Sequence, residues 1–317
     1  MDPVTTDLPI EPLSSSEYEH WSREVLDDWA NQRSFAQHIS YDAALDLASE
    51  IFNRFLPDGA DTPANYIRQV VQKGKPVGIF WLKVTGEDVL IPNLDPELDE
   101  DLVVLLEIAE NYARDLGAKT IRISVFQSDL LMKSATSVRD YGLSGTLMGL
   151  DLENFAATPD KQSKIDLQPM SESEFQTFRA HSVSEYAKEM LRSRAVSEAD
   201  ADQQSKATFQ RLLPHGKETA DQLIMTVWSE NRVVGHLWIA MKSDHGRREA
   251  FGYDMELIAS ARGKGLGREL MNVAHALLHN SGVSRVGLNV FGHNEIARNL
   301  YQSLGYKPVE ERRYKDL

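Results

Sequence analysis

Hydrophobic positions along this chain recur at helix and strand spacing in an order that appears twice. Residues 10–82 align with residues 167–239 at a constant offset of 157 without a gap, and 18 of the 73 positions are identical. Several of the identical positions are proline, glycine or tryptophan: they pair Pro12 with Pro169, Pro57 with Pro214, Gly59 with Gly216 and Trp81 with Trp238. Self-similarity at a fixed period indicates a duplicated structural unit. We therefore expect two copies of one fold, with both tryptophans in the core.

Each copy follows the same order of predicted elements. A short β-prone stretch leads to "SSSEYEHW" or "SESEFQTF", where Ser and Glu three residues apart predict a capping box and the start of a helix. A second helical stretch ends at Leu-Pro, and strands such as "PVGIFWLKV" and "VVGHLWIAM" follow. The second copy continues with the strand "EAFGYDMELI", an amphipathic helix from Gly267, the strand "RVGLNVF" and the helix "NEIARNLYQSLGY". Strands followed by single helices predict an α+β layer in each copy.

The two copies are expected to form two domains, residues 1–155 and 164–317. The polar segment Glu153–Asp166 between them predicts a linker. Charge changes at the same place: residues 1–160 carry 12 Lys+Arg against 28 Asp+Glu (12 − 28 = −16), and residues 161–317 carry 22 against 20 (22 − 20 = +2). Because nucleic acid requires a basic face, the acidic half argues against DNA or RNA as the main partner. It would suit a cationic partner, although solubility also explains it.

Composition excludes several classes of protein. The chain is 42% apolar and 26% charged, as soluble globular proteins are, and it has no cysteine for a disulfide, a thiolate metal site or a nucleophile. The first twenty residues lack a basic start and an apolar segment, and no window approaches eighteen consecutive apolar residues. We therefore expect no secretion signal, no membrane span and a cytoplasmic location. His215, His236 and His245 lack metal-ligand spacing, so no metal site is expected.

The segment "ARGKGLGREL", Ala261–Leu270, places three glycines at alternate positions where a strand gives way to a helix. The first backbone N–H groups of a helix have no partner within it, and the macrodipole presents partial positive charge there. Gly265 and Gly267 lack Cβ, so a bulky anion could approach, while Arg262 and Lys264 add positive charge. The pattern is neither a Walker loop nor a Rossmann fingerprint. It predicts a phosphate or pyrophosphate site, with a plain turn as the alternative.

A second motif lies downstream in "LNVFGHNEIARNLYQSLGY", Leu288–Tyr306, which predicts a strand, a break containing Gly292 and Asn294, and a helix presenting Tyr301. Together with the R-x-x-G-x-G loop before it, this motif resembles the GNAT superfamily of acyl-CoA-dependent N-acyltransferases. The resemblance covers about residues 165–317. The two-copy layout is similar to that of tandem GNAT proteins with one degenerate copy, such as mycothiol synthase, although nothing in this sequence indicates that enzyme's acceptor.

The resemblance implies a fold of two tandem GNAT-like domains, each with a mixed, mostly antiparallel sheet flanked by helices. It implies acetyl-CoA as acyl donor and a primary amine of a small molecule or peptide as acceptor. Backbone groups of Met255 and Leu257 would hold the pantetheine arm, and Asn294 would contact the cofactor. The pyrophosphate would lie on the loop residues Arg262, Gly263, Lys264, Gly265, Leu266 and Gly267.

The resemblance also implies catalytic roles. Tyr301 would contact the cofactor and act as the general acid that protonates the leaving thiolate, with core packing as the alternative. The proton acceptor is expected to be Glu249, thirteen residues before Arg262, or a water chain. Asp254 lies on the same strand with opposite parity, so it cannot share a face with Glu249 unless the strand contains a bulge. Glu249 could also be an exposed strand-end carboxylate.

The first copy lacks these features. Its "ELDEDL" segment places Asp99, Glu100 and Asp101 where the second copy has Lys264, Gly265 and Leu266. Carboxylates repel a pyrophosphate, although they favour a helix start. Asp129 stands in the place of Asn294, and Val138 in the place of Tyr301.

We therefore expect a degenerate first copy without CoA turnover, which shapes the acceptor cleft, mediates homodimerisation or stabilises its partner. Three residues in the second copy's first helical region are candidate acceptor contacts, with a solvated helix face as the alternative: His181, Tyr186 and Glu189. Together, the motifs and the resemblance predict an acetyl-CoA-dependent N-acetyltransferase that acts by direct attack of the amine. The alternative is a non-catalytic acyl-CoA sensor or scaffold.

Overall fold

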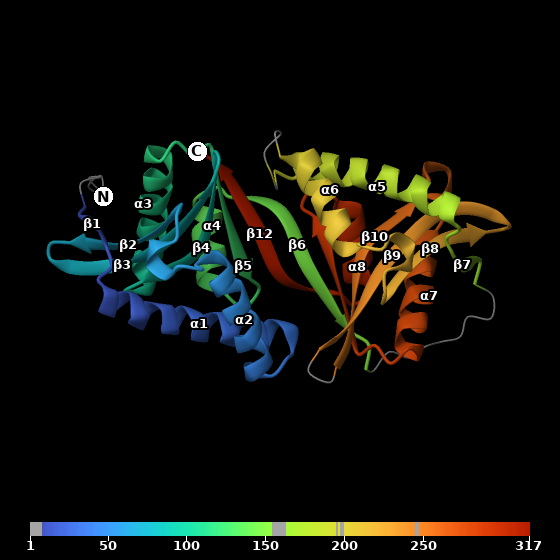
Figure 1. The fold of residues 1–317 in the computed structure, drawn as a ribbon, viewed down its shortest axis with the longest axis horizontal. Helices are drawn as coiled ribbons and strands as arrows, with labels where there is room; N and C mark the ends of the chain where they lie inside the picture. Colours follow the sequence, from blue (N-terminus) through green and yellow to red (C-terminus); the bar gives the residue numbers. More distant parts are fainter. Residues whose placement is uncertain (1–7, 154–162, 195, 197–199, 245–246) are drawn as a thin grey trace. The chain divides into compact units, whose positions relative to one another are not determined.

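The computed structural model describes residues 8–153, 163–194, 196, 200–244 and 247–317 (Figure 1). Most of the expected linker, residues 154–162, and His245 lie outside the described residues. The chain forms two compact units. One comprises Met1–Ser144 with Val309–Leu317, and the other comprises Gly145–Pro308.

The first unit contains a mixed sheet in the order β1-β2-β3-β4-β5-β12. Only β4 and β5 run parallel, and the other pairs are antiparallel. In chain order the elements are β1 (Ile10–Pro12), α1 (Ser15–Gln37), α2 (Tyr41–Phe55), β2 (Asn65–Gln72), β3 (Lys75–Thr85), β4 (Asp88–Pro96), η2 (Asp99–Asp101), α3 (Leu102–Asp115), β5 (Thr120–Phe126), α4 (Leu130–Val138) and β12 (Lys307–Asp316).

The second unit repeats this plan with the sheet order β7-β8-β9-β10-β11-β6 and one parallel pair, β10 with β11. The predicted α+β class, with mixed and mostly antiparallel sheets flanked by helices, is therefore confirmed. The elements are β6 (Gly142–Asp151), β7 (Ile165–Pro169), α5 (Glu172–Arg192), α6 (Ala201–Leu212), β8 (Gln222–Ser229), β9 (Arg232–Asp244), β10 (Arg247–Leu257), η4 (Ala259–Ala261), α7 (Leu266–Asn280), β11 (Arg285–Phe291) and α8 (Glu295–Ser303).

The last strand of each sheet comes from the other copy of the sequence. Strand β6 follows α4 of the first copy but pairs with β11, and both its Met148 and Leu152 directly after it are buried in the second unit's core. Strand β12 follows α8 of the second copy but pairs with β5. The compact units therefore differ from the expected division into residues 1–155 and 164–317. Sequence similarity follows chain order, whereas a sheet is defined by the hydrogen-bonded ladder of its strands.

A buried ion pair holds β12 in the first unit. Glu110 of α3 is fully buried, and its Oε2 lies 2.8 Å from Lys315 Nζ of β12 and 2.6 Å from Arg139 Nη2. Burial alone would raise the pKa of Glu110, but the two cations outweigh burial and hold the pKa below its usual value. A buried carboxylate needs such partners, so losing one of them leaves a costly unpaired charge.

Local features of the two copies match as the repeat predicts. Both predicted capping boxes are present, at Ser14 and Ser171. Both tryptophans are core residues: the Trp81 indole donates to Asn65 Oδ1 at 2.8 Å, and the Trp238 indole donates to Gln222 Oε1 at 2.7 Å. Each of these two indole N–H groups therefore keeps a hydrogen-bond partner inside the core, which offsets the cost of burying it.

Helices cover both faces of the second sheet. On one face the apolar stripe of α7 packs against strand residues including Leu237, Ile239 and Ala250. On the other face α5 and α6 pack on Trp238 through Phe178 and Phe209. Fully burying a side chain of this size contributes roughly 1.5–3 kcal/mol relative to exposure. The sheet is therefore fixed from both sides, and its strand ends carry the features described next.

Candidate functional site

Strands β10 and β11 separate partway along their length. Their parallel ladder covers only Glu249–Gly252 of β10, whereas the pairing of β10 with β9 continues to Leu257. Strand β11 meanwhile continues to Phe291 in its ladder with β6. Beyond Gly252, β10 therefore has no partner in the described ladder on its β11 side. Backbone N–H and C=O groups require hydrogen-bond partners, so this edge can bind an extended amide-containing ligand.

A β-bulge in β10 decides which of its carboxylates share a face. The register shifts between Gly252 and Asp254, so that Tyr253 is the extra residue. Across the ladder Glu249 lies opposite Lys242, Asp254 opposite Trp238 and Glu256 opposite His236. These β9 partners are all even-numbered and therefore share one face. The bulge thus places Asp254 on the same face as Glu249, the arrangement that a regular strand would forbid.

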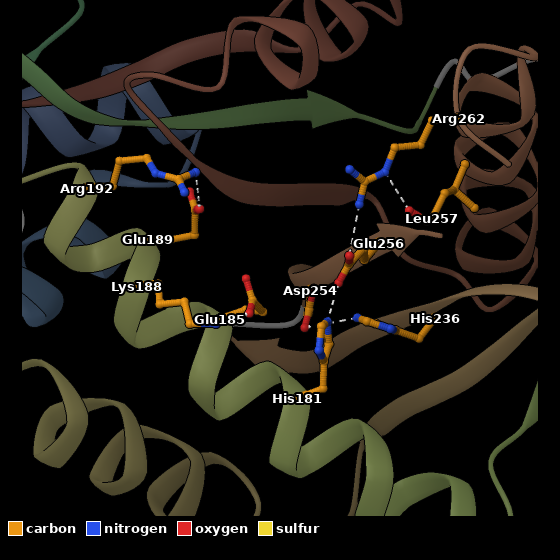
Figure 2. Close-up of polar contacts among 10 residues, drawn as sticks. All are labelled: His181, Glu185, Lys188, Glu189, Arg192, His236, Asp254, Glu256, Leu257 and Arg262. Atoms are coloured by element: carbon orange, nitrogen blue, oxygen red, sulfur yellow. Dashed lines mark hydrogen bonds and ion pairs between the residues drawn. The ribbon is translucent and has the colours of Figure 1, made fainter. Parts of the chain in front are cut away.

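A polar cluster forms where α5 crosses β10 (Figure 2), and we call it the α5–β10 cluster. It consists of His181 and Ser182 of α5, His236 of β9, and Asp254 and Glu256 of β10. His181 Nε2 lies 2.6 Å from Glu256 Oε2. Ser182 donates to Asp254 Oδ2 at 2.5 Å, and His236 Nε2 lies 3.2 Å from the same oxygen. From the sequence, His181 is a candidate acceptor contact and Asp254 a carboxylate of the strand, but no motif links Ser182 or His236 to a strand 72 or 18 residues away.

The glycine loop connects this cluster to α7. Gly263 and Gly265 have φ of +75° and +81°, and an added Cβ would meet no heavy atom within 4 Å at either position. The left-handed backbone, not crowding by the protein, therefore requires glycine at both. Gly267 lies inside the first turn of α7 and has only ordinary contact distances around it.

The mouth of α7 presents free backbone donors and cations. Its N-cap is Gly265, and no side chain caps the helix. Arg262 extends along the loop, donating to the Leu257 carbonyl at 2.7 Å and to Glu256 Oε1 at 3.0 Å (Figure 2). Lys264 is exposed beside it. Uncapped N–H groups, the helix dipole and these cations together fit a phosphate-bearing ligand.

Asn294 and Tyr301 lie on α8. The Asn294 side-chain oxygen accepts the Ala297 N–H at 3.1 Å and so caps the helix. Tyr301 is buried, with 9% of its surface exposed. Burial first, and the charge of Asp254 second, raise the pKa of Tyr301 to about 12. The phenol therefore stays protonated at neutral pH and is close enough to Asp254 to feel its charge.

Glu249 lies apart from the α5–β10 cluster and the glycine loop. It lies opposite Arg285 in the parallel ladder, three residues before the strands part at Gly252. At about 3.3 Å per residue this is roughly 10 Å along the strand. Arg285 is buried, and its guanidinium lies 3.3 Å from Asp151. Glu249 therefore lies at the closed end of the β10–β11 pair.

The other candidate acceptor contacts lie along α5. The Tyr186 ring lies 6.1 Å from the ring of Phe291, between centroids. Glu189 Oε2 lies 2.6 Å from His293 Nε2, and its Oε1 lies 2.8 Å from Arg192 (Figure 2). Tyr186 and Glu189 thus face the end of β11, whereas His181 faces the end of β10.

The first unit keeps the sheet but not the loop. Five residues separate Pro96 of β4 from Leu102 of α3, whereas eight separate Leu257 from Leu266 (102 − 96 − 1 = 5; 266 − 257 − 1 = 8). Helix α3 is preceded by the 3₁₀ turn of Asp99–Asp101, where the second unit has the glycine loop before α7.

Asp129 caps α4 as Asn294 caps α8, so that predicted equivalence holds. The equivalence of Val138 with Tyr301 is wrong. Tyr301 is the seventh residue after its cap, and the seventh residue after Asp129 is Thr136, which is fully buried. Counting from the helix caps therefore pairs Thr136 with Tyr301.

The described residues contain no group of three or more His, Cys, Asp or Glu side chains that could hold a metal ion. Among the same residues, no helix combines the length and apolar character needed to cross a membrane.

Comparison with known proteins places the second unit in a family. The acetyltransferase (GNAT) family matches residues 184–306. The uncharacterized N-acetyltransferase YycN of Bacillus subtilis (strain 168) is 33% identical over 147 residues, which is 46% of this chain and 94% of that protein. YdgE, another uncharacterized N-acetyltransferase of the same strain, is 32% identical over 152 residues, or 48% of this chain and 97% of that protein.

Across nearly the whole chain, the fold is similar to the crystal structure of a GCN5-related N-acetyltransferase from Sphaerobacter thermophilus. The TM-score is 0.55 at 13% identity, covering 98% of this chain and 95% of that one.

Proposed function

The chain belongs to the GNAT family of acetyltransferases, and we propose that its second unit transfers an acetyl group from acetyl-CoA to a primary amine of a small molecule or peptide. The observation that carries this proposal is the separation of β10 from β11 directly before the glycine loop and the uncapped α7. One continuous stretch of chain then offers backbone hydrogen bonds followed by an anion site. That sequence of features matches a ligand with an amide-containing arm ending in a pyrophosphate.

Donor binding would use the chain in this order. The unpaired edge around Met255 and Leu257 would bind the pantetheine amides through backbone groups. The loop Arg262–Gly267 would receive the pyrophosphate on its N–H groups, and Arg262 would exchange its contacts with Glu256 and Leu257 for phosphate oxygens. Charges at a helix N-terminus contribute about 0.3–1 kcal/mol each when exposed. Asn294 keeps its side-chain amide group at the mouth of α8 as a further donor.

Tyr301 would supply the proton that the departing sulfur needs. A leaving thiolate requires a positioned acid, and the phenol is protonated at neutral pH because burial raises its pKa to about 12. Direct attack by the amine also needs a proton acceptor. A path from Glu249 would have to run through water along β10, since Glu249 lies at the closed end of the strand pair.

We also propose that the first unit does not turn over acyl-CoA. Its loop is shorter by three residues (8 − 5 = 3), and three carboxylates precede its helix. A pyrophosphate there would meet like charge in place of the glycine loop.

Calorimetric titration with acetyl-CoA tests the donor site. We expect one binding event in the wild type and loss of at least about tenfold in affinity for Gly265→Asp, because the side chain places negative charge at the anion site. Gly282→Asp is the matched control, since Gly282 also has positive φ (+76°) and open space around it but lies beyond the other end of α7. Equal affinities for the two variants, or no binding by the wild type, would contradict the proposal.

A further inference from the structure

We infer that Asp254 accepts the proton released by the acceptor amine, and that Ser182 and His236 are positioning residues for its carboxylate. The inference rests on the proposed acetyl transfer and assigns the proton acceptor for that reaction. Asp254 lies immediately beyond the point where β10 leaves β11, on the face covered by α5.

The contacts of Asp254 orient one of its oxygens and leave it accessible. Oδ2 accepts the Ser182 hydroxyl at 2.5 Å and lies 3.2 Å from His236 Nε2. That nitrogen is buried and makes no hydrogen bond with any described residue, so Asp254 is the charged group it faces. The Asp254 side chain is 27% exposed, which leaves room for a substrate amine. Burial first, and the Asp254 charge second, raise the pKa of Tyr301, so the proton donor lies within range of this carboxylate's charge.

The first unit provides an internal comparison, because it builds the same backbone without these groups. Its strand β4 also has a one-residue bulge, and Asn93 follows it opposite Trp81, as Asp254 does opposite Trp238. At the offset of 157, Val25 stands for Ser182 and Ile79 for His236. The bulge and the buried tryptophan thus need neither a carboxylate nor its two partners. The polar set in the second unit is therefore explained by chemistry and not by folding.

The proton balance of the reaction is complete with these residues. The amine nitrogen forms the new C–N bond to the acetyl carbon as the C–S bond breaks. Asp254 takes the proton that the nitrogen loses, and the sulfur takes the hydroxyl proton of Tyr301. Transfer of the carboxyl proton through solvent to the phenolate then restores both groups. The products are the N-acetyl amine and the free thiol.

Other ionisable groups lie on the elements packed around this carboxylate: His181 of α5, His236 of β9, Glu256 of β10, Arg262 of the loop and Tyr301 of α8. Because His181 and Arg262 contact Glu256 and not Asp254, variants of Asp254 and Glu256 separate the two carboxylates.

The first test is Asp254→Asn, which introduces the side chain that the first unit already accommodates at Asn93. Thiol release is followed with acetyl-CoA and a panel of primary amines that includes spermidine, glucosamine and a dipeptide. We expect kcat/KM to fall by about 10²–10⁴-fold, the usual contribution of a general base, while calorimetric acetyl-CoA affinity stays within about twofold. Asp202→Asn, the same change at an exposed carboxylate of α6, is the control and should change kcat/KM by less than about threefold. Unchanged kcat/KM in Asp254→Asn would overturn the inference.

The positioning residues are tested by substitution and rescue. Ser182→Val and His236→Ile copy the first unit, and each removes a polar group that contacts the Asp254 carboxylate. We expect kcat to fall in both while calorimetric acetyl-CoA affinity stays within about twofold, and Ser182→Thr, which keeps the hydroxyl, should restore kcat. Equal kcat in Ser182→Val and Ser182→Thr would overturn the role of Ser182, and wild-type kcat in His236→Ile would overturn that of His236.

A measurement without an acceptor covers the case in which no panel amine reacts. At fixed pH, the ring ¹⁵N shifts of His236 should change in Asp254→Asn and not in Glu249→Gln. Equal spectra for the two variants would overturn the pairing of His236 with Asp254. A wild type that binds no acetyl-CoA would instead refute the proposed function, whereas binding and turnover with an indifferent Asp254→Asn would refute this inference alone.

Discussion

Asp254 and Asn93 hold equivalent places in two copies of one sheet. Each follows a bulge, and each lies opposite a buried tryptophan, Trp238 or Trp81. The two side chains have nearly the same shape, but only the carboxylate can accept a proton. The chain therefore contains a matched pair of sites with common backbone geometry and different chemistry. This pair makes the effects of single substitutions easy to interpret.

Replacing Tyr301 by Phe should slow acetyl transfer without unfolding the protein. The ring stays in the core, but the proton donor is lost, so we expect kcat to fall by about 10²-fold or more with acetyl-CoA affinity retained. The raised pKa, about 12, also means that the wild-type rate should show no alkaline fall from this residue until the pH approaches 12. Steady-state kinetics across pH measure both effects. Wild-type rates in Tyr301→Phe would exclude its role as the acid.

The exchange of terminal strands predicts which fragment of the chain folds. Residues 142–308 contain β6 and should unfold cooperatively and bind acetyl-CoA. Residues 164–317 lack β6 and with it the buried Met148 and Leu152, while their β12 has no β5 to pair with. Losing two large core side chains costs about 2–5 kcal/mol each, which is comparable with the stability of a whole domain. Circular dichroism with urea denaturation compares the fragments, and cooperative unfolding of residues 164–317 would contradict the assignment of β6.

Buried His275 should make stability depend on pH. Its pKa falls from 6.5 to about 4 because burial disfavours the charged ring, which lies 2.9 Å from the Tyr306 hydroxyl. The folded pKa is depressed, so the unfolded chain takes up the proton first as pH falls. The contribution is therefore fully present above about pH 6.5 and is lost progressively down to about pH 4, a change of roughly 3 kcal/mol.

Urea denaturation at pH 7 and pH 4 compares the wild type with His275→Phe, in which this titration is absent. The wild type should lose roughly 3 kcal/mol more than the variant over this interval. His20→Gln, at an exposed site on α1, should behave as the wild type does. Parallel losses in all three proteins would show that His275 does not titrate as its burial requires.

Much of the fold was predictable because its signals are local. Both capping boxes need only a Ser and a Glu three residues apart, and the apolar stripe of α7 needs only helical periodicity. The glycine loop was also found from a local pattern, three glycines at alternate positions before a helix. The structure adds that Gly263 and Gly265 have a left-handed backbone, which favours glycine. The roles of Ser182 and His236 had no such signal. Their contacts with Asp254 span 72 and 18 residues of sequence and depend on a helix crossing a strand.

The amino-acid sequence alone predicted the duplication, the family and the glycine loop before α7, because each depends on residue types at a constant spacing. Two further features depend on hydrogen-bond register between distant strands. The bulge at Tyr253 turns Asp254 onto the face of Glu249, and the ladders of β6 with β11 and β12 with β5 divide the units across the repeat. One extra residue in a strand reverses every later side chain, and a strand pairs with whichever edge completes a core. Neither choice can be read from one segment alone, because each depends on the partner strand.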